Sequence, residues 1–174
     1  MNAVSNDSAL TRRELRDMFA LFPTGVAIVT ARGLNDDLIA STVSSFSSVS
    51  LEPPLVLFSM ARASKSFEGW QAAHTFAVNI LAEDQRSLSA RFASSADDKW
   101  SGISSIVCET SGLPLLDGAL GFFHCRTWAR YDGGDHLIIV GEVIRAARLS
   151  TKKPLIFAAS RYARLADDVP VAAL

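Results

Sequence analysis

The sequence lacks several features that mark common classes of protein. Its 17 Lys and Arg residues are balanced by 18 Asp and Glu residues, so no basic field is available to hold a nucleic acid backbone. Its apolar runs, such as residues 136–144, are far shorter than the roughly 20 residues that a membrane helix requires. Residues 1–14 are polar and do not resemble a secretory signal. We therefore expect a soluble cytoplasmic protein that binds neither nucleic acid nor a membrane.

Cysteine pairs and glycine-rich phosphate motifs are also missing. Cys108 and Cys125 stand alone, with no second pair at metal-ligand spacing, and both lie in apolar, strand-like surroundings. This pattern favours two buried free thiols over a disulfide. No GxGxxG follows an expected strand and no GxxxxGK[ST] occurs, so the Rossmann and P-loop folds lose their main support.

The residues that are present favour one domain made mostly of strands. The chain has 174 residues, of which 49% are hydrophobic, so it can close one sizeable core but is too short for two ordinary domains. Short segments rich in β-branched and aromatic residues, bounded by turn residues, predict strands at 25–31, 54–60 and 75–81. Residues 119–131 and 136–149 flank DGGD, whose glycines permit the turn of a long antiparallel hairpin.

Helices are expected to be few and short. Thr11 and Glu14 form a capping-box pattern, and the apolar spacing that follows predicts an N-terminal helix ended by Pro23 and Gly25. Two further helices are expected at 64–73 and 82–93, and their possible N-caps are Ser64, Ser66 and Asp84. Strands without a repeat favour a closed antiparallel barrel with helices outside it over a doubly wound sheet.

Residues 41–50 place six serines and one threonine directly before an apolar strand. If they form one strand, their hydroxyls lie on both of its faces, because successive side chains alternate. Three more serines, Arg62 and Lys65 follow within residues 59–67. Hydroxyls and cations together suit the oxygens of a phosphate ester or pyrophosphate. The hypothesis is therefore a phosphate-bearing cofactor, and the alternative is a turn-rich edge whose serines bond their own backbone.

Several segments resemble, in order, the successive signatures of the short-chain flavin reductase family, the reductase components of two-component flavin-dependent monooxygenases. They are FPTGVAIVTA at 22–31, STVSSFSSVSLEPPLVLFSM at 41–60, ARASKSF at 61–67, FAVNILAEDQRSLSARFA at 76–93, DKWSGI at 98–103, LPLLDGAL at 113–120 and GDHLIIVGEV at 134–143. The resemblance implies a mainly β fold, an FMN-binding split β-barrel that is antiparallel and Greek-key-like with a few short peripheral helices. It also implies a homodimer that binds FMN or FAD between its subunits.

With this resemblance the chain divides into three parts, which are an N-terminal segment and helix over 1–21, the split-barrel domain over 22–165 and a C-terminal tail over 166–174. The resemblance also implies which residues bind the flavin, through hydroxyls along the serine run, a phosphate-binding loop and a segment that closes over the flavin. These residues are Thr42, Ser44, Ser45, Ser48, Val49, Ser50, Ser59, Arg62, Ser64, Lys65, Asn79 and Phe92.

His136 stands apart from the other histidines because it lies in the GDH signature, which the resembling reductases place beside the nicotinamide. The resemblance implies that His136 contacts NAD(P)H and that Arg161 and Tyr162 close the same pocket. A metal site is the weaker alternative, because no second histidine or carboxylate stands at ligand spacing. His74 and His124 are expected to be ordinary surface or hydrogen-bonded residues.

The implied activity is hydride transfer from NADH, or NADPH, to FMN or FAD, which supplies reduced flavin to a partner monooxygenase. Since the cofactors carry the electronic change, we assign no catalytic acid or base and no metal. No extra basic cluster accompanies GDH or SRYARL, which favours NADH. The alternative is a split-barrel flavoprotein that is not a reductase, such as a flavin-binding electron carrier or storage module. A barrel that binds another phosphorylated ligand is a third interpretation.

Overall fold

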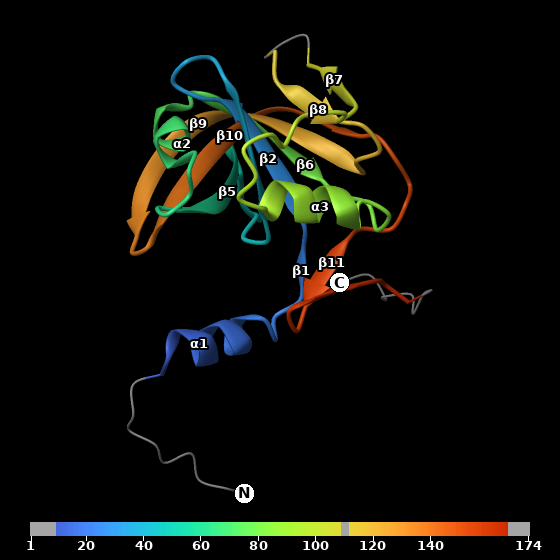
Figure 1. The fold of residues 1–174 in the computed structure, drawn as a ribbon. Coiled ribbons are helices and arrows are strands. Elements are labelled where there is room, and N and C mark those ends of the chain that lie inside the picture. Colours follow the sequence, from blue (N-terminus) through green and yellow to red (C-terminus); the bar gives the residue numbers. More distant parts are fainter. Residues whose placement is uncertain (1–9, 109–111, 167–174) are drawn as a thin grey trace, which may run out of the picture.

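A curled antiparallel sheet forms the body of the protein, and an N-terminal helix projects away from it (Figure 1). The computed structural model describes residues 10–108 and 112–166. The main sheet has seven strands in the order β3-β2-β6-β9-β10-β5-β4. They are β2 (Ala27–Arg32), β3 (Leu38–Val43), β4 (Ser47–Leu51), β5 (Pro54–Ala61), β6 (Thr75–Ile80), β9 (Gly121–Gly133) and β10 (His136–Arg148). Because β3 and β4 remain as its two edges, the barrel is split rather than closed, and the predicted mainly β split barrel is confirmed.

Smaller elements surround this sheet. A three-stranded sheet contains β1 (Thr24–Gly25), β11 (Ile156–Ala158) and β12 (Arg161–Ala163). A two-stranded sheet contains β7 (Ser105–Val107) and β8 (Pro114–Leu116). The helices are α1 (Arg12–Phe19), α2 (Phe67–Ala72) and α3 (Arg86–Ala93). None of these helices is long and apolar enough to cross a bilayer. Most of the C-terminal tail expected over 166–174 lies outside the described residues.

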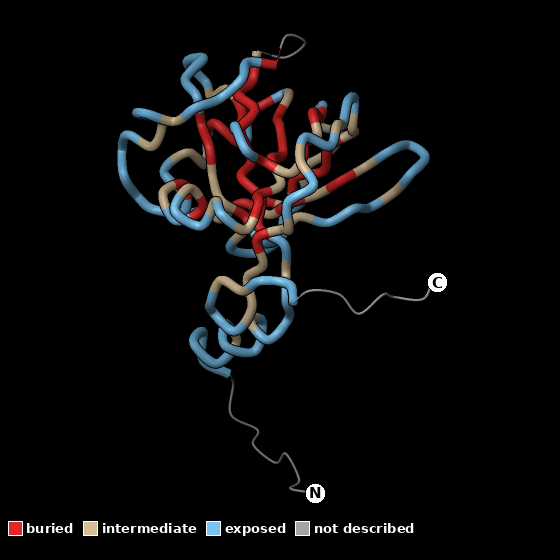
Figure 2. Tube along the Cα trace, turned by 90° about the vertical axis from the view of Figure 1, so that its right-hand side faces the viewer, coloured by how far each residue is buried: buried red, intermediate tan, exposed pale blue. Residues whose placement is uncertain are grey.

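The predicted capping box opens α1. The Thr11 hydroxyl accepts from the Glu14 backbone N–H at 3.2 Å, and the Glu14 carboxylate accepts from the Thr11 backbone N–H at 2.8 Å. The helix ends at Phe19, before the expected Pro23. No residue of α1 is buried, so the helix and the chain that follows it form an exposed arm (Figure 2).

The N-caps that we expected for the two inner helices are not formed. Ser66 occupies the N-cap position of α2 without a side-chain capping bond. Gln85, not Asp84, precedes α3, and the Asp84 carboxylate instead accepts from Lys152 at 2.5 Å. The Ser66 hydroxyl lies 3.2 Å from that of Ser64, so this side chain, like that of Asp84, is engaged outside its helix.

The barrel core is built from alternating side chains and one helix. Along β5 every second residue is buried, and Val56, Phe58 and Met60 face inward. Trp70 from α2 plugs this core, with its ring edge-on to Phe58 at a centroid distance of 5.4 Å. This alternation is the pattern of strands whose one face covers a core.

The serine run does not form one strand. β3 ends at Val43 and β4 begins at Ser47, so the alternation that one continuous strand over 41–50 would give does not apply. The Ser45 hydroxyl accepts from the Ser59 backbone N–H at 2.9 Å and thereby takes the place of a strand neighbour. Phe46 turns inward and stacks on Phe123 at 5.5 Å. A side-chain hydrogen bond and an aromatic contact thus break the strand where local propensity favours its continuation.

Buried polar groups attach β8 to the outside of the barrel. Asn79 is fully buried in β6, where its amide donates to the Ile28 carbonyl at 3.2 Å and accepts from the Leu116 backbone N–H at 2.9 Å. Thr30 donates to the Pro114 carbonyl at 3.1 Å. These bonds satisfy backbone groups that would otherwise be buried without a partner.

The long hairpin and the thiols match their predictions. β9 and β10 pair from Gly121 to His136, and the turn between them places Gly134 at φ 73°. Cys108 and Cys125 are both buried, and they form no disulfide with each other. Burial raises the pKa of the Cys125 thiol to about 12, so it stays protonated and unreactive at neutral pH.

His124 differs from its expected role. It lies on β9 with 3% of its surface exposed, and neither ring nitrogen has a hydrogen-bond partner. Burial, and then the charge of Arg145 on the neighbouring strand, lowers the pKa of His124. The folded protein therefore holds this imidazole in its neutral form.

This burial predicts a pH dependence of stability. A depressed pKa in the folded state means that the unfolded chain binds the extra proton below its own pKa of about 6.5. We expect the free energy of unfolding, measured by urea titration, to be constant above that pH and to fall as the pH decreases below it. His124→Phe should flatten this decline, whereas His74→Gln, a change at an exposed histidine, should leave it unchanged. An equal decline in His124→Phe and the parent would contradict this prediction.

Candidate functional site

A cavity of about 840 Å³ lies at the split between the sheet edge and two helices. Its lining residues come from three stretches of chain, 34–45, 59–66 and 92–100, with Gly69 and His136 beside them. These stretches are β3 and its flanking turns, the end of β5 with the start of α2, and the end of α3 with the loop after it. The volume lies within the range of small-molecule and cofactor sites.

Just over half of the predicted site residues line this cavity. They are Thr42, Ser44, Ser45, Ser59, Ser64, Lys65, Phe92 and His136. The first six of these come from the two serine-containing segments that flank β4 and β5 in the chain. The break of the strand at Ser44 therefore brings both segments to one wall.

Hydroxyl groups along this wall have defined orientations. Thr42 donates to the Ser89 carbonyl of α3 at 2.7 Å, which ties β3 to the helix. The hydroxyls of Ser64 and Ser66 lie 3.2 Å apart. Each hydroxyl has one proton and two acceptor lone pairs, so each keeps capacity for a polar ligand after these contacts.

Two lysines provide positive charge in the cavity. Lys65 Nζ donates to the Asp97 carboxylate at 2.7 Å and to the Ser95 carbonyl at 3.1 Å. Lys99 Nζ donates to the Phe92 carbonyl at 3.2 Å. Burial, and then the charge of Lys65, lowers the pKa of Lys99. An anion near Lys99 would favour its charged form, so the two lysines make this part of the cavity suitable for a phosphate.

The sequence analysis missed part of this wall. Asp97, Lys99 and Trp100 all line the cavity, yet none was assigned a role. Trp100 donates its indole N–H to the Leu38 carbonyl at 3.1 Å, and its ring lies edge-on to Phe92 at 5.0 Å. Lys99 and Trp100 lie in the DKWSGI segment at 98–103, which carries part of the family resemblance, and Asp97 directly precedes it.

Other predicted flavin residues lie outside the lining. Ser48, Val49 and Ser50 belong to the edge strand β4, where Val49 is half exposed at a β-bulge. The Asn79 amide is engaged in the core, as described above. Arg62 does not line the cavity, although Ala61 and Ala63 on either side of it do. Their roles toward a flavin remain predictions.

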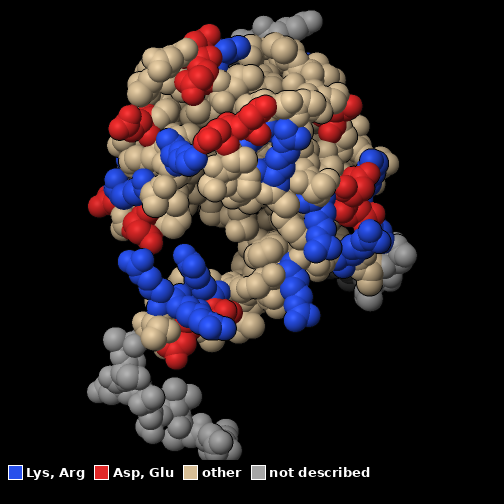
Figure 3. All heavy atoms as spheres, viewed as in Figure 1, with Lys and Arg blue, Asp and Glu red and all other residues tan. Residues whose placement is uncertain are grey.

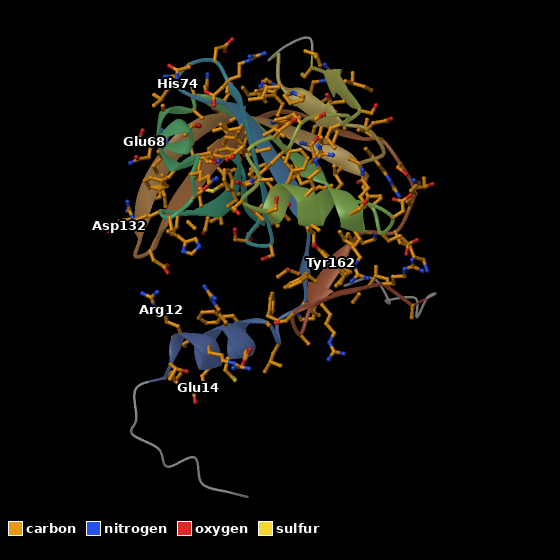
Figure 4. The ribbon with its side chains drawn as sticks, in the orientation of Figure 1. Arg12, Glu14, Glu68, His74, Asp132 and Tyr162 are labelled. Carbon is orange, nitrogen blue, oxygen red and sulfur yellow. The ribbon has the colours of Figure 1, made fainter. Side chains whose placement is uncertain are left out.

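The structure separates the three residues expected around the nicotinamide. Tyr162 packs under α3, with its hydroxyl 2.9 Å from that of Ser89 and its ring 5.1 Å from the Arg86 guanidinium carbon. Arg161 precedes it on β12, and neither residue lines the cavity that contains His136. Figure 4 shows Tyr162 beside β11, away from the hairpin tip near Asp132. Within one chain, these residues do not form one pocket.

His136 lies at the tip of the β9–β10 hairpin, at the edge of the cavity. Its Nδ1 is 2.7 Å from the Asp135 carboxylate, and this hydrogen bond is the main reason that the pKa of Asp135 is lowered. The charge of Arg12, on the arm, lowers the pKa of Asp135 further. Figure 3 shows a gap between the arm and the body, and Figure 4 shows Arg12 rising from α1 toward the body.

In the described parts of the chain, no group of three or more His, Cys, Asp or Glu side chains could hold a metal ion. What the cavity provides is a polar wall of hydroxyls, a pair of lysines and one histidine at its edge. This arrangement can bind and orient a polar, phosphorylated molecule.

Comparison with known proteins identifies the family. A family model described as "Flavin reductase like domain" matches residues 18–166. The FMN reductase (NADH) SmoA of Agrobacterium fabrum is 41% identical over 156 residues, which cover 87% of this chain and 85% of SmoA. The reductase subunit HsaB of a flavin-dependent monooxygenase of Rhodococcus jostii is 35% identical over 179 residues, which cover 99% of this chain and 90% of HsaB.

A solved structure agrees with these sequence relatives. The NADH:FAD oxidoreductase SgcE6 of Streptomyces globisporus, in complex with NAD and FAD fragments, superimposes with a TM-score of 0.86 at 37% identity. The match covers 91% of this chain and 95% of SgcE6. Fold, family model and sequence identity together show that this chain belongs to the flavin reductase family of oxidoreductases.

Proposed function

We propose that this protein transfers hydride from NADH to FMN or FAD and supplies the reduced flavin to a separate flavin-dependent monooxygenase. The single observation that carries the proposal is the cavity in which Lys65 and Lys99 lie close to a wall of serine hydroxyls. NADH is the reductant named for SmoA and SgcE6, and HsaB is the reductase subunit of a monooxygenase. NADH is available in the cytoplasm, where we expect the protein to act.

The residues of the chain bind and orient, and the bound flavin and nicotinamide supply the hydride chemistry. Lys65 and Lys99 bind the flavin phosphate, with Ser59 and Ser64 as hydroxyl partners. Thr42, Ser44 and Ser45, in the lining stretch 34–45, contact the polar edge and ribityl chain of the flavin. His136 contacts the nicotinamide from the cavity edge, where its Nδ1 is already engaged by Asp135. Hydride transfer needs no side-chain acid or base. Its rate therefore depends on how closely these residues hold the flavin and nicotinamide rings together.

A homodimer completes the site in this proposal. Arg161 and Tyr162 lie away from His136 within one chain, and Ser48, Val49 and Ser50 lie on an open edge. A second copy can bring such residues against the cavity of the first. Large apolar side chains are exposed on both possible contact surfaces, which are the arm and the outer side of the sheet. They are Leu10, Met18, Phe19, Leu21 and Phe22, and Val49, Leu51, Trp128, Tyr131 and Ile144.

Turnover tests the proposed activity against the alternative of a flavin carrier. Purified protein mixed with NADH and excess FMN or FAD should oxidise NADH continuously, because the flavin is a substrate that leaves after reduction. The same mixture with NADPH should react more slowly. Stoichiometric flavin binding without sustained NADH oxidation would instead establish a carrier or storage protein.

Lys99 should act through the flavin phosphate. We expect Lys99→Met to weaken FMN binding about tenfold or more, or about 1.4 kcal/mol, because it removes a charge-assisted hydrogen bond. Binding of riboflavin, which has no phosphate, should change little. Quenching of flavin fluorescence measures both affinities. Lys152→Met is a matched control, because Lys152 lies outside the cavity in a surface pair with Asp84. Equal losses for FMN and riboflavin would assign Lys99 to the shape of the cavity instead.

The arm should stabilise the dimer. Phe19 and Phe22 are 71% and 75% exposed in a single chain, and burying them against a second copy would remove this apolar surface from water. We expect the parent protein to sediment as a dimer and the double variant Phe19→Ser, Phe22→Ser to dissociate at higher protein concentration. Ile106→Ser on β7, at the other end of the molecule from α1, serves as the control (Figure 1). A fully active monomer would rule the dimer out.

A further inference from the structure

Arg62 follows β5, and its contacts reach the tip of the β9–β10 hairpin. Its Nη2 donates to the Asp132 carboxylate at 2.6 Å and its Nε to the Gly134 carbonyl at 3.0 Å. Its backbone N–H donates to the Asp135 carbonyl at 2.9 Å. The guanidinium carbon also lies 5.5 Å from the centre of the Phe67 ring, so a cation–π contact holds it from the other side. One residue thus binds three positions of a single turn.

The outermost residues of the turn that Arg62 binds are open to solvent. Gly134 has a φ of 73°, and a Cβ built at this position would meet no atom within 4 Å. The side chains of Asp132 and Asp135 are 79% and 84% exposed. The strand pairs of His136 with Ala61 and Gly133 join the tip to the sheet, and we expect the exposed residues beyond those pairs to be mobile unless a specific contact restrains them.

His136 is the next residue after this turn. It pairs with Ala61 across β5 and β10, directly before Arg62, and it lines the cavity. The Asp135 carboxylate forms a hydrogen bond with Nδ1 of His136, and the Asp135 backbone carbonyl accepts from the Arg62 backbone N–H. A displacement of the tip would therefore move the His136 ring relative to the cavity, while Lys65 and Lys99 are held by contacts elsewhere.

The geometry also separates Arg62 from Lys65, although both lie in the segment that resembles a phosphate-binding loop. Two guanidinium nitrogens of Arg62 are committed to the hairpin, and the residue does not line the cavity. Two acceptors in different directions suit the fork of an arginine, which a single ammonium group cannot reproduce.

We propose that Arg62 is a positioning residue that clamps the β9–β10 tip and thereby holds His136 at the edge of the cavity. It acts on use of the nicotinamide substrate and not on binding of the flavin phosphate. The proposal rests on the proposed function of His136 as a nicotinamide contact.

Variants of both sides of the clamp test this proposal. In the full-length protein, Arg62→Met and Asp132→Asn should each raise the KM for NADH about threefold to tenfold, a range that suits an exposed pair supported by further hydrogen bonds. We expect kcat and the affinities for FMN and riboflavin to change by less than about twofold. The double variant should be no worse than Arg62→Met alone, because both changes remove one interaction. Arg62→Lys should restore part of the loss.

A control and a direct readout separate the clamp from general damage. Arg126→Met breaks an exposed pair with Glu142 on the same two strands, at 2.6 Å, and should leave the KM for NADH unchanged. Hydrogen exchange should show faster exchange at the Arg62 backbone N–H and across the hairpin tip in Arg62→Met, with the remaining sheet unaffected. His136→Ala should lower kcat/KM for NADH about tenfold or more, which sets the scale for the clamp variants.

Three outcomes would overturn an assignment, and they are distinguishable. A loss of FMN affinity in Arg62→Met that riboflavin does not share would show that Arg62 binds the phosphate, and the positioning role would be wrong. An unchanged KM for NADH in both clamp variants, with His136→Ala impaired, would overturn the clamp and leave the proposed function intact. Unchanged NADH use in His136→Ala would remove the nicotinamide role of His136 from the proposed function, and the clamp proposal with it.

Discussion

The cavity depends on one side chain that replaces a strand neighbour. Ser59 lies on β5 beyond the last residue paired with β4, and its backbone N–H is bonded by the Ser45 hydroxyl at 2.9 Å. Because this hydroxyl satisfies the backbone, β4 can leave β5 at Ser47 and the chain can cross toward β3. With Phe46 stacked in the core on Phe123, the crossing is anchored on both sides. The sheet therefore stays split, and the cavity lies at this split.

The rest of the site follows from where this opening lies. The C-terminal end of α3 and the loop after it line the opening, so Lys99 and Trp100 reach it from a distant part of the chain. Thr42 ties β3 to α3 through the Ser89 carbonyl, which keeps the two walls at a constant separation. A cofactor that brings its own chemistry needs such fixed walls more than it needs reactive side chains. Ser44 and Ser45, in the serine run before the apolar strand, thus belong to the polar wall of the cavity.

Two regions of the single chain expose large apolar side chains, and the proposed homodimer would use both of them. In the arm formed by α1 and the chain after it, no residue of the helix is buried (Figure 2), and a gap lies between the arm and the body (Figure 3). The edge strand β4 carries Val49 and Leu51 exposed at the other side of the opening. Exposed apolar surface of this extent is typical of an interface, and both regions are candidates for the contact in the proposed homodimer.

The sequence by itself determined the elements whose stabilising contacts are local. The capping box of Thr11 and Glu14 spans three residues, and the glycines of the hairpin turn act on their own backbone, so both were predicted correctly. The successive family signatures added the split barrel and most residues of the serine wall. Only the tertiary structure decided which neighbouring residues share a function. Lys65 bonds to a loop 32 positions away and Arg62 to a turn 70 positions away, although only two residues separate them. The hydrogen bonds of Asn79 and Lys99 were likewise decided by the folded chain. A hydrogen bond forms only between groups that the fold brings within about 3 Å, and spacing along the sequence does not encode that distance.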